Sequence, residues 1–190
     1  MIIGILGVKR SGKDTTADYL VTKYGYNKLA FAQPLKDACK ILFDFSEDQM
    51  NSDSKEDVDP TWGVSPRIVF QYLGTDIFRK EIHKIMPDIE NNFWVKVMEN
   101  KIMSLKENNK DAKIIVSDVR FQNEIDMIHR LNGIIIKIER PSLKNIDTHE
   151  SEKNICNLNG DIIIVNDKTI NDLYDETDNI VNNVFKKIYL

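Results

Sequence analysis

The stretch that decides the fold of this chain is Gly7-Val8-Lys9-Arg10-Ser11-Gly12-Lys13-Asp14-Thr15. The apolar run at residues 2–6 precedes it, and apolar residues at helical spacing follow it over residues 17–24. A strand, a glycine-bracketed loop and a helix are the context in which Gly-x-x-x-x-Gly-Lys indicates a phosphate-binding loop. We expect a helix to begin at about Lys13, so that backbone N–H groups and the positive end of the helix dipole face one anion.

One residue of this loop departs from the common pattern. The residue after the lysine is usually serine or threonine, whose hydroxyl binds magnesium, whereas this chain has Asp14. A carboxylate can still bind magnesium, directly or through water, because the ion prefers hard oxygen ligands. Thr15 points elsewhere on the helix and is not a simple substitute. A chance match is the alternative interpretation, and the flanking strand and helix favour the functional one.

The composition describes an ordinary globular chain. Its 190 residues, 42% hydrophobic and 29% charged, predict one domain over residues 1–190 with a full core. The formal net charge of −4 argues against a surface for nucleic acid or for acidic membranes. No apolar run approaches a membrane span and the chain begins with a strand, so we expect a cytoplasmic protein. Cys39 and Cys156 lack metal-type spacing, and we expect both to be reduced.

Helix and strand signals alternate along the chain, which favours an α/β fold with a parallel sheet. Strands are expected at residues 2–6, 27–31, 113–117, 134–138 and 162–165. Helices are expected to open at Pro34, at Ser65-Pro66 and at Asn92, and again near residues 125 and 170. Residues 46–62 are expected to be a mobile loop with one turn of helix. The polar segment from Arg140 to Asn159 has no structural pattern, which is typical of a lid or a binding loop.

Polar residues follow the predicted strands at their carboxyl ends, which is the edge where ligands of open parallel sheets bind. They are Ser117-Asp118-Val119-Arg120, Arg140 and Asn166-Asp167. An acid, two arginines and an anion-binding loop at one sheet edge fit phosphoryl transfer, in which positioning and charge neutralisation supply most of the catalysis. The alternatives are that Asp118 caps the next helix and that the arginines are solvated.

The predicted helix at residues 67–79 has more polar residues than packing needs. Gln71 could contact a base edge, while Arg67 and Arg79 could hold an anion. An amphipathic helix with a solvated face and a cap at Gly74 explains the same pattern.

Three other residues allow two interpretations each. Trp94 could stack on a base or belong to the core, and Lys36 by itself looks like a solvated lysine. Arg10 lies inside the loop, where a phosphate contact is favoured over a surface role. The histidines show neither metal-ligand spacing nor a nucleophile partner.

On these residues the chain resembles the deoxynucleoside monophosphate kinases of bacteriophages and large DNA viruses, within the P-loop nucleoside monophosphate kinase superfamily. The most specific piece is residues 7–18, because that family carries aspartate at the position of Asp14. Further similar pieces are Phe31-Ala32, Pro34-Leu35-Lys36, Gln71-Tyr72-Leu73-Gly74-Thr75-Asp76, Trp94-Val95-Lys96, Ser117-Asp118-Val119-Arg120, Arg140-Pro141, Thr148-His149-Glu150 and Val165-Asn166-Asp167. The resemblance covers nearly the whole length, but residues 46–62 match little.

The resemblance implies a three-layer P-loop NTPase fold with a central parallel sheet of about five strands flanked by helices. It implies a mobile lid at about 140–160 and a helical monophosphate-binding region at about 33–106. The implied reaction uses ATP with Mg²⁺ as the donor and a deoxynucleoside monophosphate as the acceptor. The implied setting is viral, in the host cytoplasm, and relatives are often homodimers.

The resemblance also implies roles for individual residues. ATP would be bound by Gly7, Ser11, Gly12, Lys13, Asp14, Thr15, Asn166 and Asp167, with Asp14 and Asp118 at the magnesium ion. The acceptor would be bound by Lys9, Arg10, Lys36, Arg67, Gln71, Gly74, Thr75, Arg79, Trp94, Asp118, Arg120 and Glu124. The catalytic residues would be Lys13, Arg10, Asp14, Arg120 and Arg140.

Two other interpretations stay open. Animal phosphomevalonate kinases share a similar loop and a Ser-Asp-x-Arg strand end, so another small phosphorylated acceptor is the main alternative. A nucleotide-regulated binding protein is the alternative from a different class, and it would need a partner-facing surface. Gln71 and Trp94 favour a nucleotide acceptor, because a base needs edge contacts and stacking.

Overall fold

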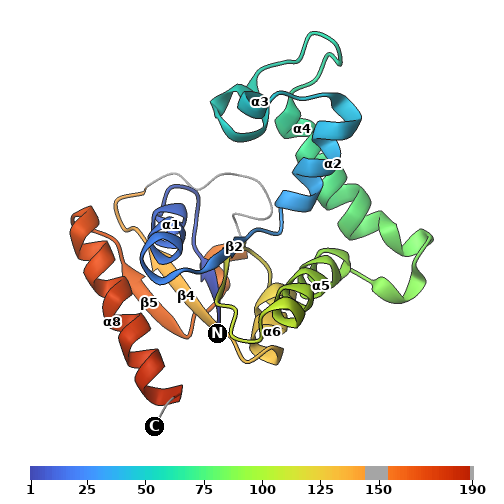
Figure 1. Ribbon diagram of the computed structural model, residues 1–190. Coiled ribbons are helices and arrows are strands. Elements are labelled where there is room, and N and C mark those ends of the chain that lie inside the picture. Colours follow the sequence, from blue (N-terminus) through green and yellow to red (C-terminus); the bar gives the residue numbers. More distant parts are fainter. Residues whose placement is uncertain (144–153, 189–190) are drawn as a thin grey trace. The chain divides into compact units, whose positions relative to one another are not determined.

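Five strands, four of them rich in isoleucine, form one all-parallel sheet (Figure 1). They are β1 (Ile2–Leu6), β2 (Asn27–Leu29), β3 (Ile114–Val119), β4 (Ile134–Glu139) and β5 (Ile162–Val165). Their order across the sheet is β2-β3-β1-β4-β5. The strand order therefore switches direction at β1, and ligands of open α/β sheets bind beyond the carboxyl ends of the strands at such a point. The predicted α/β fold with about five parallel strands is confirmed.

Helices cover both faces of this sheet (Figure 1). On one face, α1 (Lys13–Tyr24) and α8 (Ile170–Ile188) contribute Leu20 and Leu173 to a buried cluster with the strand isoleucines. On the other face, α6 (Gln122–Arg130) packs so closely on β1 that a Cβ at Gly4 would lie 2.5 Å from Ile128 Cδ1. The three predicted layers are therefore present.

The structure, a computed structural model, describes residues 1–143 and 154–188. It divides into two compact units, the first comprising residues 1–30 and 102–190 and the second residues 31–101. The second unit is close in extent to the region at 33–106 expected to bind the acceptor. Among the described helices, none is both long and apolar enough to cross a membrane. Cys39 and Cys156 are both free thiols.

The second unit consists of short helices. They are α2 (Gln33–Phe43), α3 (Glu47–Asn51), η1 (Asp53–Glu56), α4 (Pro66–Gln71), η2 (Tyr72–Glu81), η3 (Ile82–Lys84), η4 (Pro87–Ile89) and the first part of α5 (Phe93–Asn108). The prediction of a loop with one helical turn at residues 46–62 was wrong, because α3 and η1 lie there. A capping box between Ser46 and Gln49 opens α3, and this pairing is visible in the sequence as Ser-x-x-Gln.

The predicted helix at residues 67–79 is longer than expected and changes type. After Gln71 it continues as a π-helix through Glu81, so Gly74 lies inside the helix and the predicted cap at Gly74 was wrong. The Trp94 indole N–H donates to the Gly74 carbonyl at 2.8 Å. π-Helical turns are rare and occur frequently at functional sites.

The structure differs from the predictions for Asp118 and for the segment at residues 140–159. β3 runs to Val119, and α6 is capped from Phe121 with the help of Glu124, so the interpretation of Asp118 as a helix cap was wrong. The segment at residues 140–159 is not structureless throughout, because η5 (Asn154–Asn157) is helical and Ile155 is buried. Residues 144–153 of the predicted lid, which include the Thr148-His149-Glu150 piece, lie outside the described residues.

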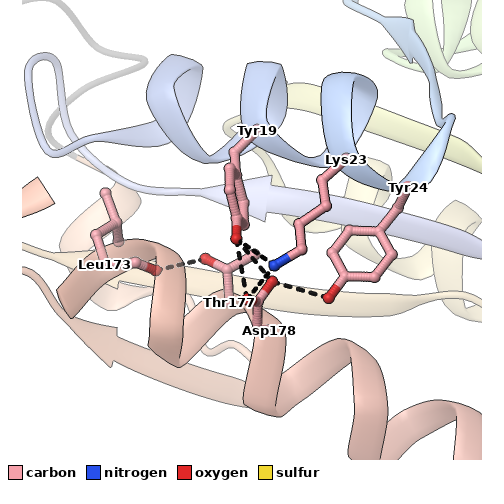
Figure 2. Close-up of polar contacts among 6 residues, drawn as sticks. All are labelled: Tyr19, Lys23, Tyr24, Leu173, Thr177 and Asp178. Atoms are coloured by element: carbon pink, nitrogen blue, oxygen red, sulfur yellow. Dashed lines mark hydrogen bonds and ion pairs between the residues drawn. The ribbon is translucent and has the colours of Figure 1, made fainter. Parts of the chain in front are cut away.

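One polar cluster joins the two helices on the first face of the sheet (Figure 2). The Asp178 carboxylate of α8 accepts hydrogen bonds from the hydroxyls of Tyr19 (2.9 Å) and Tyr24 (2.8 Å) on α1, and from Lys23 Nζ (2.5 Å). Partial burial raises the pKa of Asp178, but the hydrogen bonds from Lys23, Tyr24 and Tyr19 outweigh it and hold that pKa below its ordinary value. Ionised Asp178 therefore stabilises the fold.

Replacing Asp178 with asparagine is expected to lower the free energy of unfolding at pH 7 by about 1–2 kcal/mol. Because the folded-state pKa is depressed, this stabilisation is present above the ordinary carboxyl pKa of about 4 and is lost as pH falls through the folded-state pKa. Urea unfolding of the wild-type protein and of Asp178→Asn should show that the difference between their free energies of unfolding becomes smaller from pH 7 to pH 3. Asp175→Asn, an exposed change on the same helix, is the control. A difference in the free energy of unfolding that does not change with pH would contradict the stabilising role of the ionised Asp178 carboxylate.

Candidate active site

The loop between β1 and α1 has the backbone of an anion-binding turn. Gly12 precedes α1 with φ of 112°, and Arg10 has φ of 67°, so both lie in the left-handed region. For arginine this conformation is uncommon, and such residues concentrate at functional loops. The helix begins at Lys13, as predicted, so its first N–H groups lie beside the loop.

The two glycines of the loop are required by packing. A Cβ at Gly7 would lie 2.6 Å from both the Ser11 hydroxyl and the Ile138 carbonyl oxygen. A Cβ at Gly12 would lie 2.6 Å from Asn166 Nδ2. Both contacts are shorter than real Cβ atoms make, so a side chain at Gly7 would displace the loop or β4, and one at Gly12 would displace the Asn166 side chain.

Side chains from two other strand ends hold the loop backbone. Asn166, which follows β5, donates from Nδ2 to the Ser11 carbonyl at 2.8 Å. Arg140, which follows β4, has Nη1 3.4 Å from the Arg10 carbonyl. The structure thus brings these two predicted site residues to the loop, as expected for carboxyl ends of neighbouring parallel strands.

Two polar side chains of the loop are buried. The Lys13 ammonium donates to the Val8 carbonyl at 2.7 Å, and the lysine is only 7% exposed. The Ser11 hydroxyl is fully buried and has no hydrogen-bond partner within the described part of the chain. Buried hydroxyls are nearly always hydrogen-bonded, so an unpartnered one at this loop is an unusual feature.

A cavity of about 280 Å³ opens at this loop. Its lining residues are Arg10, Gly12, Lys13, Asp14, Thr15, Arg140, Asn166, Lys168, Ile170 and Leu173. Four of them are cationic and one is a carboxylate, in a chain whose net charge is −4. The cavity therefore concentrates positive charge, and its apolar wall at the start of α8 is the part that a base or another flat apolar group can contact.

Three lining residues were missed as site residues by the sequence prediction. Lys168, Ile170 and Leu173 lie around residue 170, where only the opening of the last helix was predicted. Leu173 is buried, but Ile170 is 54% exposed. The signal available was position, because all three follow β5 at the sheet edge where Asn166 was predicted.

The predicted acidic residues differ in their surroundings. The Asp14 side chain is 82% exposed and its carboxylate lies 3.5 Å from Lys28 Nζ, while Asp118 is half-buried within β3. Glu124 is 1% exposed and accepts hydrogen bonds from the backbone N–H groups of Arg120 (2.8 Å) and Phe121 (3.2 Å). Glu124 thus fixes the turn that carries Arg120.

Predicted acceptor residues on α2, α4, η2 and α5 all belong to the second unit. Lys36 Nζ lies 3.2 Å from Asn51 Oδ1, and Arg67 Nε lies 4.0 Å from Glu56 Oε1. Trp94 is 8% exposed and packs edge-to-face on Phe78 and Phe93. Of the two interpretations of Trp94, the core one matches this position. Gln71, Gly74, Thr75 and Arg79 are half-buried along the α4–η2 helix.

Comparisons with known proteins agree with this geometry. A family model described as deoxynucleotide monophosphate kinase matches residues 1–61 and 43–177. A protein of Acanthamoeba polyphaga mimivirus, named "Putative deoxynucleotide monophosphate kinase", is 41% identical over 187 residues, which is 96% of this chain and 97% of that protein. The deoxynucleotide monophosphate kinase of Enterobacteria phage T4 is 25% identical, with 94% of this chain and 97% of that protein covered.

Solved structures share the fold at low sequence identity. The dephospho-CoA kinase from Campylobacter jejuni has a TM-score of 0.50 at 16% identity and covers 98% of both chains. A gluconokinase from Sinorhizobium meliloti has a TM-score of 0.52 at 9% identity, covering 98% of this chain and 94% of that one. At these identities the similarity shows the fold alone.

Proposed function

This chain belongs to the deoxynucleotide monophosphate kinase family, and from that premise we propose that it transfers the γ-phosphoryl group of ATP to a deoxynucleoside monophosphate. The products are ADP and a deoxynucleoside diphosphate. The observation that carries this proposal is the cavity at the β1–α1 loop, which is lined by four cationic side chains and one carboxylate. Such a lining favours a polyphosphate over a neutral ligand.

The donor site is assigned to the first unit. Backbone N–H groups of residues 7–14 and the Ser11 hydroxyl bind the phosphates of ATP, with Thr15 and Asp167 beside them, and Lys13 places its charge on the outer ones. Asn166 acts by holding the loop through the Ser11 carbonyl. Ile170 and Leu173 provide an apolar wall for the base.

The acceptor site is assigned mainly to the second unit. Lys36, Arg67 and Arg79 supply positive charge for the phosphate of the monophosphate, and Gln71 and Thr75 supply polar contacts. Trp94 acts by holding the Gly74 carbonyl of the π-helix, to which its indole N–H donates. The roles predicted for Lys9, Arg10, Asp118 and Arg120, which belong to the first unit, remain separate predictions.

The chemistry requires neither a covalent intermediate nor a general base. The second pKa of a phosphate monoester is about 6, so the attacking oxygen is already ionised at pH 7. The barrier is electrostatic, because two anions must approach within bonding distance. Lys13, Arg10 and Arg140 line one cavity and neutralise this repulsion, and Arg120 is assigned the same task.

The carboxylates of Asp14 and Asp118 are the residues proposed to hold magnesium, directly or through water. Among the described residues no group of three or more His, Cys, Asp or Glu side chains could hold a metal ion, which fits an ion whose other ligands are phosphate oxygens and water. When bound, magnesium supplies charge neutralisation at the transferred phosphoryl group.

Asp14→Asn is expected to raise the magnesium concentration needed for half-maximal activity by roughly tenfold, since an amide oxygen is a weaker ligand for a hard cation. Magnesium titrations at fixed ATP measure this shift. Asp18→Asn is the matched control, because Lys28 contacts both Asp14 (3.5 Å) and Asp18 (2.8 Å). If both variants give the wild-type titration curve, Asp14 does not bind the metal.

An ADP-release assay with a panel of acceptors tests the proposed function. The panel contains four deoxynucleoside monophosphates, the matching ribonucleotides and phosphomevalonate. Turnover of at least one deoxynucleotide, well above the other acceptors, is expected. Preference for phosphomevalonate would favour the other kinase interpretation, and ATP binding without turnover of any acceptor would favour a switch. The homodimer implied by the resemblance is a separate proposal, tested by sedimentation of the purified chain.

A further inference from the structure

The cavity at the β1–α1 loop contains a negative charge of the protein itself. Asp14 belongs to the first turn of α1 and lines this cavity, with its side chain 82% exposed. The free N–H groups of a helix N-terminus attract anions, so the Asp14 carboxylate and the phosphates of a nucleotide are drawn to the same end of α1. Two anions held so close repel each other unless a cation lies beside them.

The cation beside Asp14 is Lys28 of β2. Its ammonium donates a hydrogen bond to Asp18 Oδ1 at 2.8 Å and lies 3.5 Å from Asp14 Oδ1. The two aspartates lie four residues apart on α1, so their carboxylates share one face of the helix, and the ammonium lies against both. All three residues belong to the first unit.

This arrangement has a structural interpretation and a functional one. Two carboxylates four residues apart repel each other along a helix, and a lysine placed against both relieves that repulsion. This explains the contact with Asp18, which does not line the cavity. The contact with Asp14 has a further consequence, because Asp14 does line it. Lys28 is not among the lining residues, so its effect on a ligand is exerted through the Asp14 carboxylate.

We propose that Lys28 is a positioning residue of the ATP site, which acts as the counter-ion of Asp14 and lets the β1–α1 loop bind the phosphates of ATP in the absence of magnesium. This inference rests on the proposed function, since it takes the cavity as the ATP site. Asp14 has a second counter-ion when magnesium is bound, so the requirement for Lys28 applies to metal-free ATP.

Lys28→Met removes the charge and keeps most of the length of the side chain. The dissociation constant for ATP in EDTA is expected to rise about three- to tenfold at low ionic strength, and the rise should become smaller in about 0.5 M salt. With magnesium the constant should stay within about twofold of the wild-type value. Calorimetric titration measures both constants without any turnover. Lys28→Arg keeps the charge and should bind metal-free ATP as the wild type does.

Two further variants identify Asp14 as the residue through which Lys28 acts. Asp18→Asn is the matched control, because it removes the other carboxylate and leaves Lys28 beside Asp14. It should not weaken the binding of metal-free ATP. Adding Lys28→Met to Asp14→Asn should cause no further loss of affinity for metal-free ATP, because the repelling carboxylate is already gone. Urea unfolding of each variant reports the purely structural contribution separately.

The inference is overturned if Lys28→Met binds metal-free ATP as the wild type does, or if the loss persists in the Asp14→Asn background. It is also overturned if affinity falls equally with and without magnesium, which is the result of a structural role alone. The unmodified chain is titrated first. Binding of ATP with magnesium but not in EDTA would overturn the inference and leave the proposed function standing. No binding of ATP in either condition would contradict the proposed function itself.

Discussion

Replacing Lys13 with alanine is expected to lower kcat at least about a hundredfold, as for the loss of a charged group that contacts the transition state. Lys13 is 7% exposed, lies in the cavity at the β1–α1 loop and has its ammonium 2.7 Å from the Val8 carbonyl. The lost charge is needed most when the transferred phosphoryl group lies between donor and acceptor. Steady-state kinetics with saturating ATP measure this effect.

The control for Lys13→Ala is Lys110→Ala, which removes a lysine charge from an exposed turn before β3. It should keep wild-type kcat. Circular dichroism and urea unfolding of Lys13→Ala establish that the fold is intact, because the removed side chain is at the start of α1. Near-normal kcat in folded Lys13→Ala would remove this lysine from catalysis.

Replacing Gly12 with alanine is expected to weaken ATP binding by at least about thirtyfold. The new Cβ would lie 2.6 Å from Asn166 Nδ2, the atom that holds the Ser11 carbonyl. The backbone at residue 12, with φ of 112°, is also one that side chains adopt only with strain of about 1–3 kcal/mol. Calorimetric titration with ATP and magnesium measures the affinity.

Gly25→Ala is the matched control for Gly12→Ala. Gly25 also has a left-handed backbone, with φ of 69°, but a Cβ there would meet nothing within 4 Å. This variant should lose some stability through backbone strain and retain wild-type ATP affinity. Equal loss of affinity in both variants would show that general destabilisation, not the geometry of the phosphate loop, explains the result.

The parts of the fold that follow from local signals were predictable from the sequence. The β1–α1 loop was predictable because two glycines, a lysine, a preceding apolar run and a following helix occur within about twenty residues. The strands were predictable because isoleucine-rich runs fit a sheet that is covered on both faces. The carboxyl ends of those strands then predicted that Arg140 and Asn166 lie at the edge of the loop, where both contact its backbone.

The parts that depend on tertiary contacts were not predictable. In the π-helix at Tyr72–Glu81, the Gly74 carbonyl accepts a hydrogen bond from Trp94, which lies twenty residues further along the chain. No local sequence pattern indicates that hydrogen bond. Glu124 was predicted to bind the acceptor, and the structure adds a local role that no sequence pattern indicated, because its buried carboxylate accepts hydrogen bonds from two backbone N–H groups at the turn before α6. The pairing of Lys36 with Asn51 likewise depends on how α2 and α3 pack.

The most direct test of the central claim is to follow γ-³²P-labelled ATP, with magnesium, purified chain and one deoxynucleoside monophosphate, and to identify the labelled product. The proposed phosphoryl transfer requires that label leaves ATP only when the acceptor is present and that it appears, in equal amount, as the terminal phosphate of the deoxynucleoside diphosphate. Label released as inorganic phosphate, or retained in ATP with every deoxynucleotide tested, would contradict it.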